Sequence, residues 1–169
     1  MAAGDITPTY GSPGTFTITL ASLATSSTKL VGRESTLLDV DALNCTDVLL
    51  GGKITTGTTP TTAKSIEVWA VAPLDGTPTW PDVFDGTDSA ETLTAELKAS
   101  LCKLVASMAT TGTSDVTYAF SGISLASLFG GVLPSDVVLF VTHDTAVNLN
   151  ATGGNHVLYY QPITMNVAS

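Results

Sequence analysis

The sequence predicts an all-β protein, an antiparallel β-sandwich of jelly-roll type with one or two short helices and an extended N-terminal arm. Short apolar or alternating segments, separated by turn signals every ten to fifteen residues, give seven to nine strands. No strand–helix alternation is visible, which disfavours a parallel α/β sheet. Thr and Ser supply 43 of the 169 residues and charged residues only 12%, against about 25% in an ordinary domain. Because Thr is β-branched, it suits a half-exposed strand.

The length predicts one domain. We expect residues 1–14 to form the extended arm and residues 15–169 to form a single β-sandwich domain. The arm is rich in Pro and Gly and has little periodicity. Ile6 and Tyr10 give it two apolar side chains with which to dock.

In the first half of the chain, Thr15–Leu20 alternates strictly, which predicts a strand with one buried face. Ser35–Val40 is a weaker strand candidate. Thr46–Thr55 is a strand whose Gly51–Gly52 pair predicts a bulge, a sharp bend or the close approach of another backbone. Ser65–Ala72 is a strand that places Trp69 in the core or at an interface.

Residues 73–89 predict a long loop, because they hold three Pro, two Gly and four Asp. Trp80 and Phe84 are its apolar anchors. Loops of this length are uncommon unless they have a function. The following segment, Asp88–Leu97, could open a short helix, although it lacks a capping box.

In the second half, Leu101–Met108 and Asp115–Phe120 alternate as strands. Ile123–Phe129 has helix-like spacing closed by Gly130 and Gly131, and helix and strand both stay open. Val137–Thr142 is continuously apolar, which predicts a strand buried on both faces. His156–Gln161 and Ile163–Val167 end the chain as strand, with a break at Pro162 that suits a sheet edge.

The charge balance excludes several classes of partner. A net charge of −9 with only six basic residues argues against nucleic acid and against an anionic membrane surface. The sequence shows no apolar run long enough to span a membrane and no secretory signal. Cys45 and Cys102 are read as buried free thiols, with a disulfide left open.

No residue pattern points to catalysis, a cofactor or a metal, so we expect a protein that is not an enzyme. Asp82, Asp85, Asp88 and Glu91 fail the spacing of an EF-hand, although an irregular calcium site on this loop stays open. His143 and His156 could bind zinc only with ligands that the sequence does not supply. The Gly pairs lack the setting of a phosphate loop, and no nucleophile elbow is present.

Aromatic and apolar residues outside the expected core are the candidates for binding. Trp80 precedes a proline on the long loop, and exposed loop aromatics commonly anchor interfaces. We expect the partner interface to include Ile6, Tyr10, Trp80 and Phe84.

Four stretches together resemble a family of small tailed-bacteriophage head decoration, or cement, proteins: TYGSPGTFTITLASLA, GGKITTGTTPTTAKSIEVWA, PDVFDGTDSAETLT and SLASLFGGVLPSDVVLFVTHDTAVNLNATGGNHVLYYQPI. The resemblance implies a jelly roll that binds the outside of a phage capsid and stabilises it by bridging capsomers. It implies the major capsid protein of an HK97-type shell as partner, self-association as a dimer or trimer, and a location on the virion exterior after synthesis in the host bacterial cytoplasm. The chain has Ser135 and Asp136 where the family tends to be basic, so no specific contact is carried over there.

Two other functions remain open. A glycan- or receptor-binding module of a phage tail or fibre would use loop aromatics such as Trp80, with Asn and Asp nearby. A hydrolase built on a β-sandwich would need a reactive constellation that the sequence does not reveal.

Overall fold

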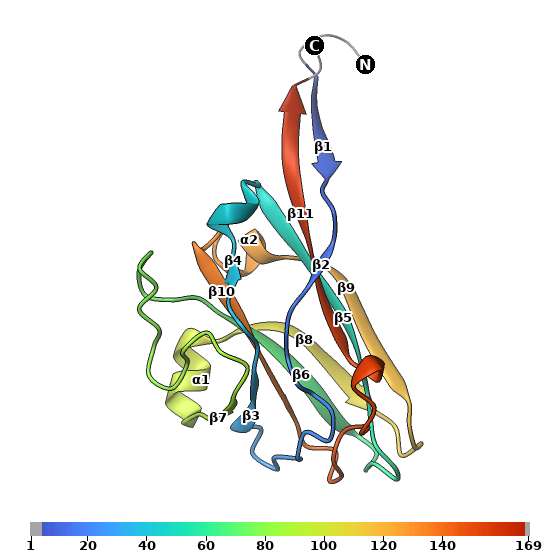
Figure 1. Cartoon of the computed structure of the whole chain (residues 1–169). Coiled ribbons are helices and arrows are strands. Elements are labelled where there is room, and N and C mark those ends of the chain that lie inside the picture. The colour runs from blue at the N-terminus through green and yellow to red at the C-terminus, as the bar shows by residue number, and fades with distance from the viewer. Residues whose placement is uncertain (1–4, 168–169) are drawn as a thin grey trace.

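The computed structural model describes residues 5–167, so the first four residues of the expected arm lie outside the described part. The chain forms two antiparallel sheets packed face to face (Figure 1). The strands are β1 (Ile6–Tyr10), β2 (Gly14–Thr15), β3 (Val31–Glu34), β4 (Leu38–Asp39), β5 (Asp47–Thr55), β6 (Lys64–Val71), β7 (Ala90–Thr92), β8 (Lys103–Thr110), β9 (Thr117–Ser124), β10 (Asp136–His143) and β11 (Val157–Val167). The helices are α1 (Ala95–Leu101) and α2 (Leu125–Leu128), with 3₁₀ turns η1 (Asp41–Leu43) and η2 (Gly153–Asn155).

The order of the strands is that of a jelly roll. Sheet A runs β1–β11–β5–β9, with β2 also on β11, and sheet B runs β7–β3–β10–β6–β8, with β4 also on β10. If β1, β4 and β7 are set aside, the eight remaining strands pair first with last, as β2·β11, β3·β10, β5·β9 and β6·β8. This is the pairing of one long antiparallel ribbon rolled over itself. The predicted fold class is confirmed.

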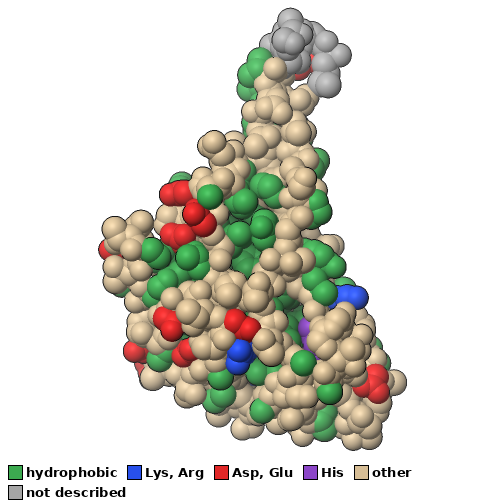
Figure 2. Space-filling view, in the orientation of Figure 1, with side chains coloured by type: hydrophobic (Ala, Val, Ile, Leu, Met, Phe, Trp, Pro, Cys, Tyr) green, Lys and Arg blue, Asp and Glu red, His purple; other side chains and the backbone are tan. Residues whose placement is uncertain are grey.

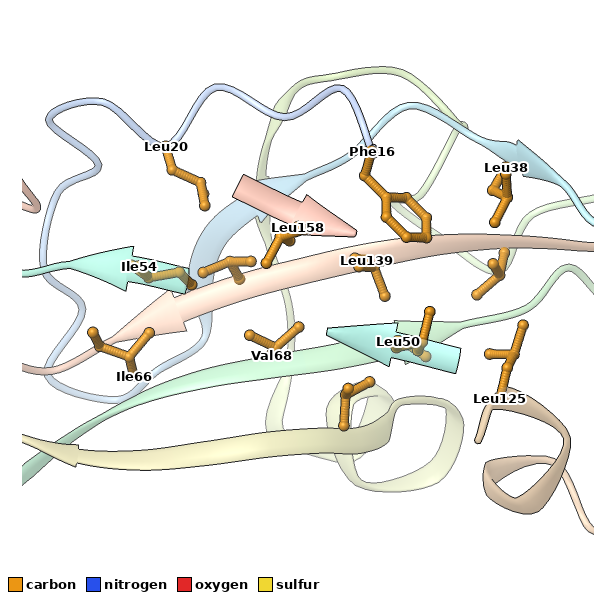
Figure 3. Packing of buried hydrophobic residues seen from close by; sticks show 14 of the residues in the cluster. Phe16, Leu20, Leu38, Leu50, Ile54, Ile66, Val68, Leu125, Leu139 and Leu158 are labelled. Atoms are coloured by element: carbon orange, nitrogen blue, oxygen red, sulfur yellow. The ribbon is translucent and has the colours of Figure 1, made fainter. Parts of the chain in front are cut away.

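The buried apolar residues form two clusters. The main core lies between the two sheets, and a second, smaller cluster lies outside sheet B. Inner side chains such as Leu50, Leu139 and Leu158 meet in the main core (Figure 3). Val138 and Phe140 point to the opposite side of β10 and join a second cluster. All eight residues of β10 are buried, which confirms the strand predicted to be buried on both faces.

The two-glycine strand and the second helix also follow the sequence. Between Leu50 and Gly52 the register of β5 with β9 shifts, but the extra residue lies on β9 and not on β5. Of the three alternatives, the close approach of another backbone is the one found, because a Cβ at Gly52 would lie 2.8 Å from the Val157 carbonyl oxygen. Beyond β9, Ser124 caps α2 through its hydroxyl, which accepts from the Ser127 N–H. The helix ends where Gly130 and Gly131 take positive φ values of 80° and 96°, because glycine adopts this conformation without steric cost.

The strand predicted over Thr15–Leu20 is wrong beyond Thr15. Phe16 and Leu20 are buried as the alternation predicts, but the backbone leaves the ladder. The Phe16 N–H donates to Leu158 of sheet A, and the Thr17 carbonyl accepts from Thr36, which lies between β3 and β4 of sheet B. The segment therefore crosses from one sheet to the other.

Three other boundaries differ from the prediction. β3 was missed because Gly32 and two charged residues interrupt its apolar pattern, and only Leu38–Asp39 of the weak candidate is strand. The expected helix over Asp88–Leu97 is wrong in place, because β7 comes first and α1 starts after its cap, Thr94. In β8, Val105 is an extra residue opposite β6. This bulge reverses the alternation, so that Val105 is buried and Leu104 is exposed.

Gly32 offers a test of the packing around β10. A Cβ at this position would lie 2.2 Å from the Val141 carbonyl oxygen and 2.6 Å from the Phe140 ring. We expect Gly32→Ala to lower the free energy of unfolding by about 3 kcal/mol, because backbone and a buried ring must both move. Gly76→Ala is the matched control, since a Cβ there has no atom within 4 Å. Urea denaturation measures both, and equal midpoints would contradict this packing.

Candidate partner-binding face

The outer faces of the two sheets differ in their covering. Outside sheet B, residues of the long loop and α1 pack over β10: Phe84 meets Phe140 edge to face at 6.0 Å, and Leu97 packs against the same cluster. Outside sheet A, alternate residues stay open to solvent, as Tyr159 at 43% exposure and Met165 at 53% show. We call the outer side of sheet A the open face.

The open face is also poor in charge. Within the described residues, the strands of sheet A carry only Asp47 and Lys53. The strands of sheet B carry Arg33, Glu34, Asp39, Lys64, Glu67, Glu91, Lys103 and Asp136. Burying hydroxyls and apolar groups costs much less free energy than burying unpaired charges. Removing water from the open face therefore costs less than removing it from the outer face of sheet B.

Sheet A extends beyond the sandwich as a stem, formed by β1 and residues 163–167 of β11 (Figure 1). The stem is two-stranded beyond Ile163, which is buried and still pairs with Asp47 of β5. Residues that pair directly across antiparallel strands point to the same side. The register therefore gives the stem an apolar face and a polar face. The apolar face holds the pairs Ile6–Val167, Pro8–Met165 and Tyr10–Ile163. The polar face holds Thr7–Asn166 and Thr9–Thr164, and the Asn166 amide donates to the Thr9 hydroxyl at 2.7 Å.

The apolar face of the stem is largely uncovered. Ile6 is 69% exposed, Tyr10 59% and Val167 68%. In the view of Figure 2 the stem is mostly tan, with a few hydrophobic side chains and no Lys or Arg. A two-stranded ribbon is marginally stable alone, and exposed apolar patches mark interaction sites. The stem therefore has the character of a contact segment.

The stem joins the sandwich without the break expected at Pro162, and that prediction is wrong. β11 runs through this residue, which pairs with Val48 on one side while its carbonyl accepts from the Gly11 N–H on the other. Proline has no N–H to return to the Gly11 carbonyl. The side-chain amide of Gln161 donates to that carbonyl instead, at 3.1 Å. The neighbouring glutamine thus replaces the bond that proline removes.

A hollow of about 340 Å³ lies in the open face over Gly51. Opposite Gly51, β9 has one extra residue, and Gly122 there has φ of 72°. Because Gly51 has no side chain, the backbone forms the floor of the hollow. Tyr159 pairs directly with Gly51 and stands beside the hollow, which Leu49 and Gln161 also line.

The four residues predicted for the interface do not share one surface. Ile6 and Tyr10 lie together on the apolar face of the stem. Trp80 and Phe84 pack against the cluster outside sheet B. Phe84 is only 3% exposed, so it anchors the loop from inside and is not part of a contact surface in this structure.

Sequence reasoning missed several residues of the open face: Pro8, Leu49, Gly51, Met165 and Val167. The alternation in Ile6–Tyr10 and in Ile163–Val167 was the available signal. It does not reveal that these two distant segments pair with each other, and that pairing is what gathers the apolar residues on one side.

The acidic residues of the long loop are engaged separately. Asp88 accepts from Arg33 Nε at 2.6 Å and from the Thr19 backbone and hydroxyl. Asp85 accepts from the N–H and hydroxyl of Thr87. Within residues 5–167, no three His, Cys, Asp or Glu side chains gather as a group that could hold a metal ion.

The remaining sequence candidates have structural partners. His143 lies with Nδ1 2.9 Å from the Thr145 hydroxyl and Nε2 3.1 Å from the Leu23 carbonyl, and burial lowers its pKa. The Nε2 atom of His156 lies 2.8 Å from the Asn150 carbonyl, and burial lowers the pKa of this residue too. Cys45 and Cys102 are both free thiols.

Glu34 holds the long loop to sheet B. Its side chain is fully buried, and its carboxyl oxygens accept from the backbone N–H groups of Asp85 and Gly86. Burial raises the pKa of this carboxyl to about 7 from its ordinary 4.5, although the two backbone bonds act to lower it. The loop is thus anchored by a carboxyl group that changes charge near neutral pH.

Comparison with models of known protein families finds no match, and a search of curated proteins finds no match either. No helix in the described part of the chain is both long enough and apolar enough to cross a membrane.

The raised pKa of Glu34 predicts a dependence of stability on pH. Between pH 4.5 and 7 the folded protein holds a proton that the unfolded chain has released, so the free energy of unfolding falls as pH rises. Comparison with Glu34→Gln removes the contribution of the other titrating groups. We expect the free energy of unfolding of wild type, minus that of Glu34→Gln, to be about 3 kcal/mol lower at pH 7 than at pH 4.5. Urea denaturation of both proteins at each pH measures this difference. A difference that is constant with pH would contradict the assignment.

Gln161→Ala tests the junction of the stem. Because Gly11 and Pro162 form a hydrogen-bonded pair, the alternation of antiparallel ladders places the Thr7 and Thr9 N–H groups toward β11. Losing one bond of about 1 kcal/mol at the junction should speed hydrogen exchange of these two amides by about fivefold, with the core unchanged. Tyr159→Phe, two residues along the same face of β11, should leave their exchange unaltered. Unchanged exchange in Gln161→Ala would show that the glutamine does not secure the stem.

Proposed function

We propose that this chain is a capsid decoration protein, a structural module that binds the outside of a tailed-phage head and stabilises it by bridging capsomers. The observation that carries the proposal is the open face of sheet A, with its stem. It combines a rigid sheet, exposed apolar side chains and almost no charge. Such a surface suits a large protein partner better than it suits a small substrate.

The stabilising mechanism is mass action. A protein that binds only the assembled shell lowers the free energy of the assembled state and not that of dissociated subunits. Each copy adds contacts across a boundary between capsomers, and many symmetric copies act together. No catalytic residue is needed for this role.

The charge of the chain is compatible with the outer surface of a head. With a net charge of −9, the protein is repelled by packaged DNA and lacks the row of cations that phosphate binding needs. The sequence resemblance to decoration proteins supplies the partner, the major capsid protein of an HK97-type shell.

The glycan-binding alternative has little support from the two tryptophans. Trp80 packs partly buried against the cluster outside sheet B. Over the ring of Trp69, the Lys98 ammonium lies 4.6 Å from the centroid, and the Trp69 indole N–H donates to Glu67 at 3.0 Å. Stacking on a sugar needs a free ring face on an exposed side chain, which suits neither residue.

The proposal predicts where the protein travels in an infected-cell lysate. When filled heads, free tails and soluble protein are separated on a gradient, we expect mass spectrometry to find this chain in the heads at hundreds of copies. Trp80→Ala should not change the amount bound to heads, because Trp80 lies away from the open face. If the chain sediments with tails or stays in the soluble fraction, the proposal is overturned and the receptor-binding alternative is favoured.

A further inference from the structure

The open face has a shape that fits a copy of itself. Tyr159 and the hollow over Gly51 are side by side, since these two residues pair directly across β11 and β5. In a two-fold contact, residue i of one copy meets residue j of the other, and j meets i. A projection next to a hollow is therefore self-complementary: each Tyr159 enters the hollow of the other copy. Tyrosine is among the residues that most often anchor interfaces.

The area of the open face shows how much of it a stable dimer would have to bury. With strands about 4.8 Å apart and a rise of about 3.4 Å per residue, the stem alone presents roughly 160 Å² of flat area. The four-stranded part and the stem together present roughly 600 Å² of flat area. Side chains that project from the sheet make the accessible surface larger than this. A stable interface uses about 800 Å² of accessible surface on each partner. The stem alone is too small, whereas the whole open face is close to what a stable dimer needs.

We propose that the open face of sheet A, including the apolar face of the stem, is a two-fold interface between two copies of this chain. The contact covers the apolar side chains of the stem, which the single chain leaves in water. The capsid role proposed above uses the same face, so in a head-bound chain the shell takes the place of the second copy, and the dimer is tested on the free chain.

The test is the mass of the full chain in solution, by sedimentation velocity over a range of concentrations. We expect wild type to sediment at twice the 17.3 kDa of one chain. Met165→Asp places a charge on the apolar face and should raise the dissociation constant at least tenfold. Asn166→Asp is the matched control, because it adds the same charge one residue away on the polar face, and it should remain a dimer.

Tyr159→Ala gives a second test that leaves the stem intact, and it should weaken the dimer as Met165→Asp does. Circular dichroism and thermal unfolding check that each variant is folded. A wild-type chain that is monomeric at every concentration overturns the proposal, whatever the variants do. A dimer that Met165→Asp and Tyr159→Ala leave as tight as Asn166→Asp overturns it too, because the contact then lies on another surface.

Discussion

The burial of β10 on both faces is the constraint on which the rest of the structure depends. Its inward side chains, such as Leu139, belong to the core between the sheets, and its outward side chains, such as Phe140, need a second cover. The chain supplies that cover with the long loop and α1, both inserted between β6 and β8. β10 is therefore enclosed on both sides, whereas outward residues of sheet A, such as Tyr159, stay exposed.

The distribution of charge follows from the same asymmetry. A polar loop laid over an apolar sheet must be tied down, and the ties here are ionic or charge-assisted: Glu34 holds the loop backbone, and Asp88 holds Arg33. Lys29 and Lys98 both bind Glu67 beside α1. Sheet A has no loop to anchor, and its strands need few charges. Removing water from a face with few charges costs less free energy than removing it from a charged face. The covering of β10 by the loop and α1 therefore leaves the outer side of sheet A as the surface that a partner can cover at the lower cost.

Local patterns predicted the parts of the fold that depend on local chemistry. The continuous apolar run at Val137–Thr142 predicted a strand buried on both faces, and Gly51–Gly52 predicted the close approach of a neighbouring backbone. Long-range pairing was not visible. Nothing in Ile6–Tyr10 indicates that it lies against Ile163–Val167, and nothing in Thr15–Leu20 indicates that its backbone crosses between sheets. Phe84 is predicted both as an apolar anchor of its loop and as part of the partner interface. In the structure it is buried as an anchor, because β10 needs an apolar cover and Phe84 provides it.

The same limit applies to the candidate site. The sequence places Ile6 and Tyr10 on a contact segment, while Met165 reads as an ordinary strand residue. Only the register of β1 on β11 shows that these side chains share one face. The resemblance to phage decoration proteins names a kind of partner, and the structure offers a surface with the chemistry to meet one.

Hydroxyl-radical footprinting of the concentrated or head-bound protein tests most directly whether the open face is a contact surface. Met165 and Tyr159 lie on that face, and Leu74, at 66% exposure on the loop outside sheet B, serves as the internal reference. Each residue is compared with itself in dilute protein and in the concentrated or head-bound protein. We expect Met165 and Tyr159 to become protected from oxidation while Leu74 does not. Equal oxidation of Met165 and Tyr159 in both states would show that the open face is not a contact surface.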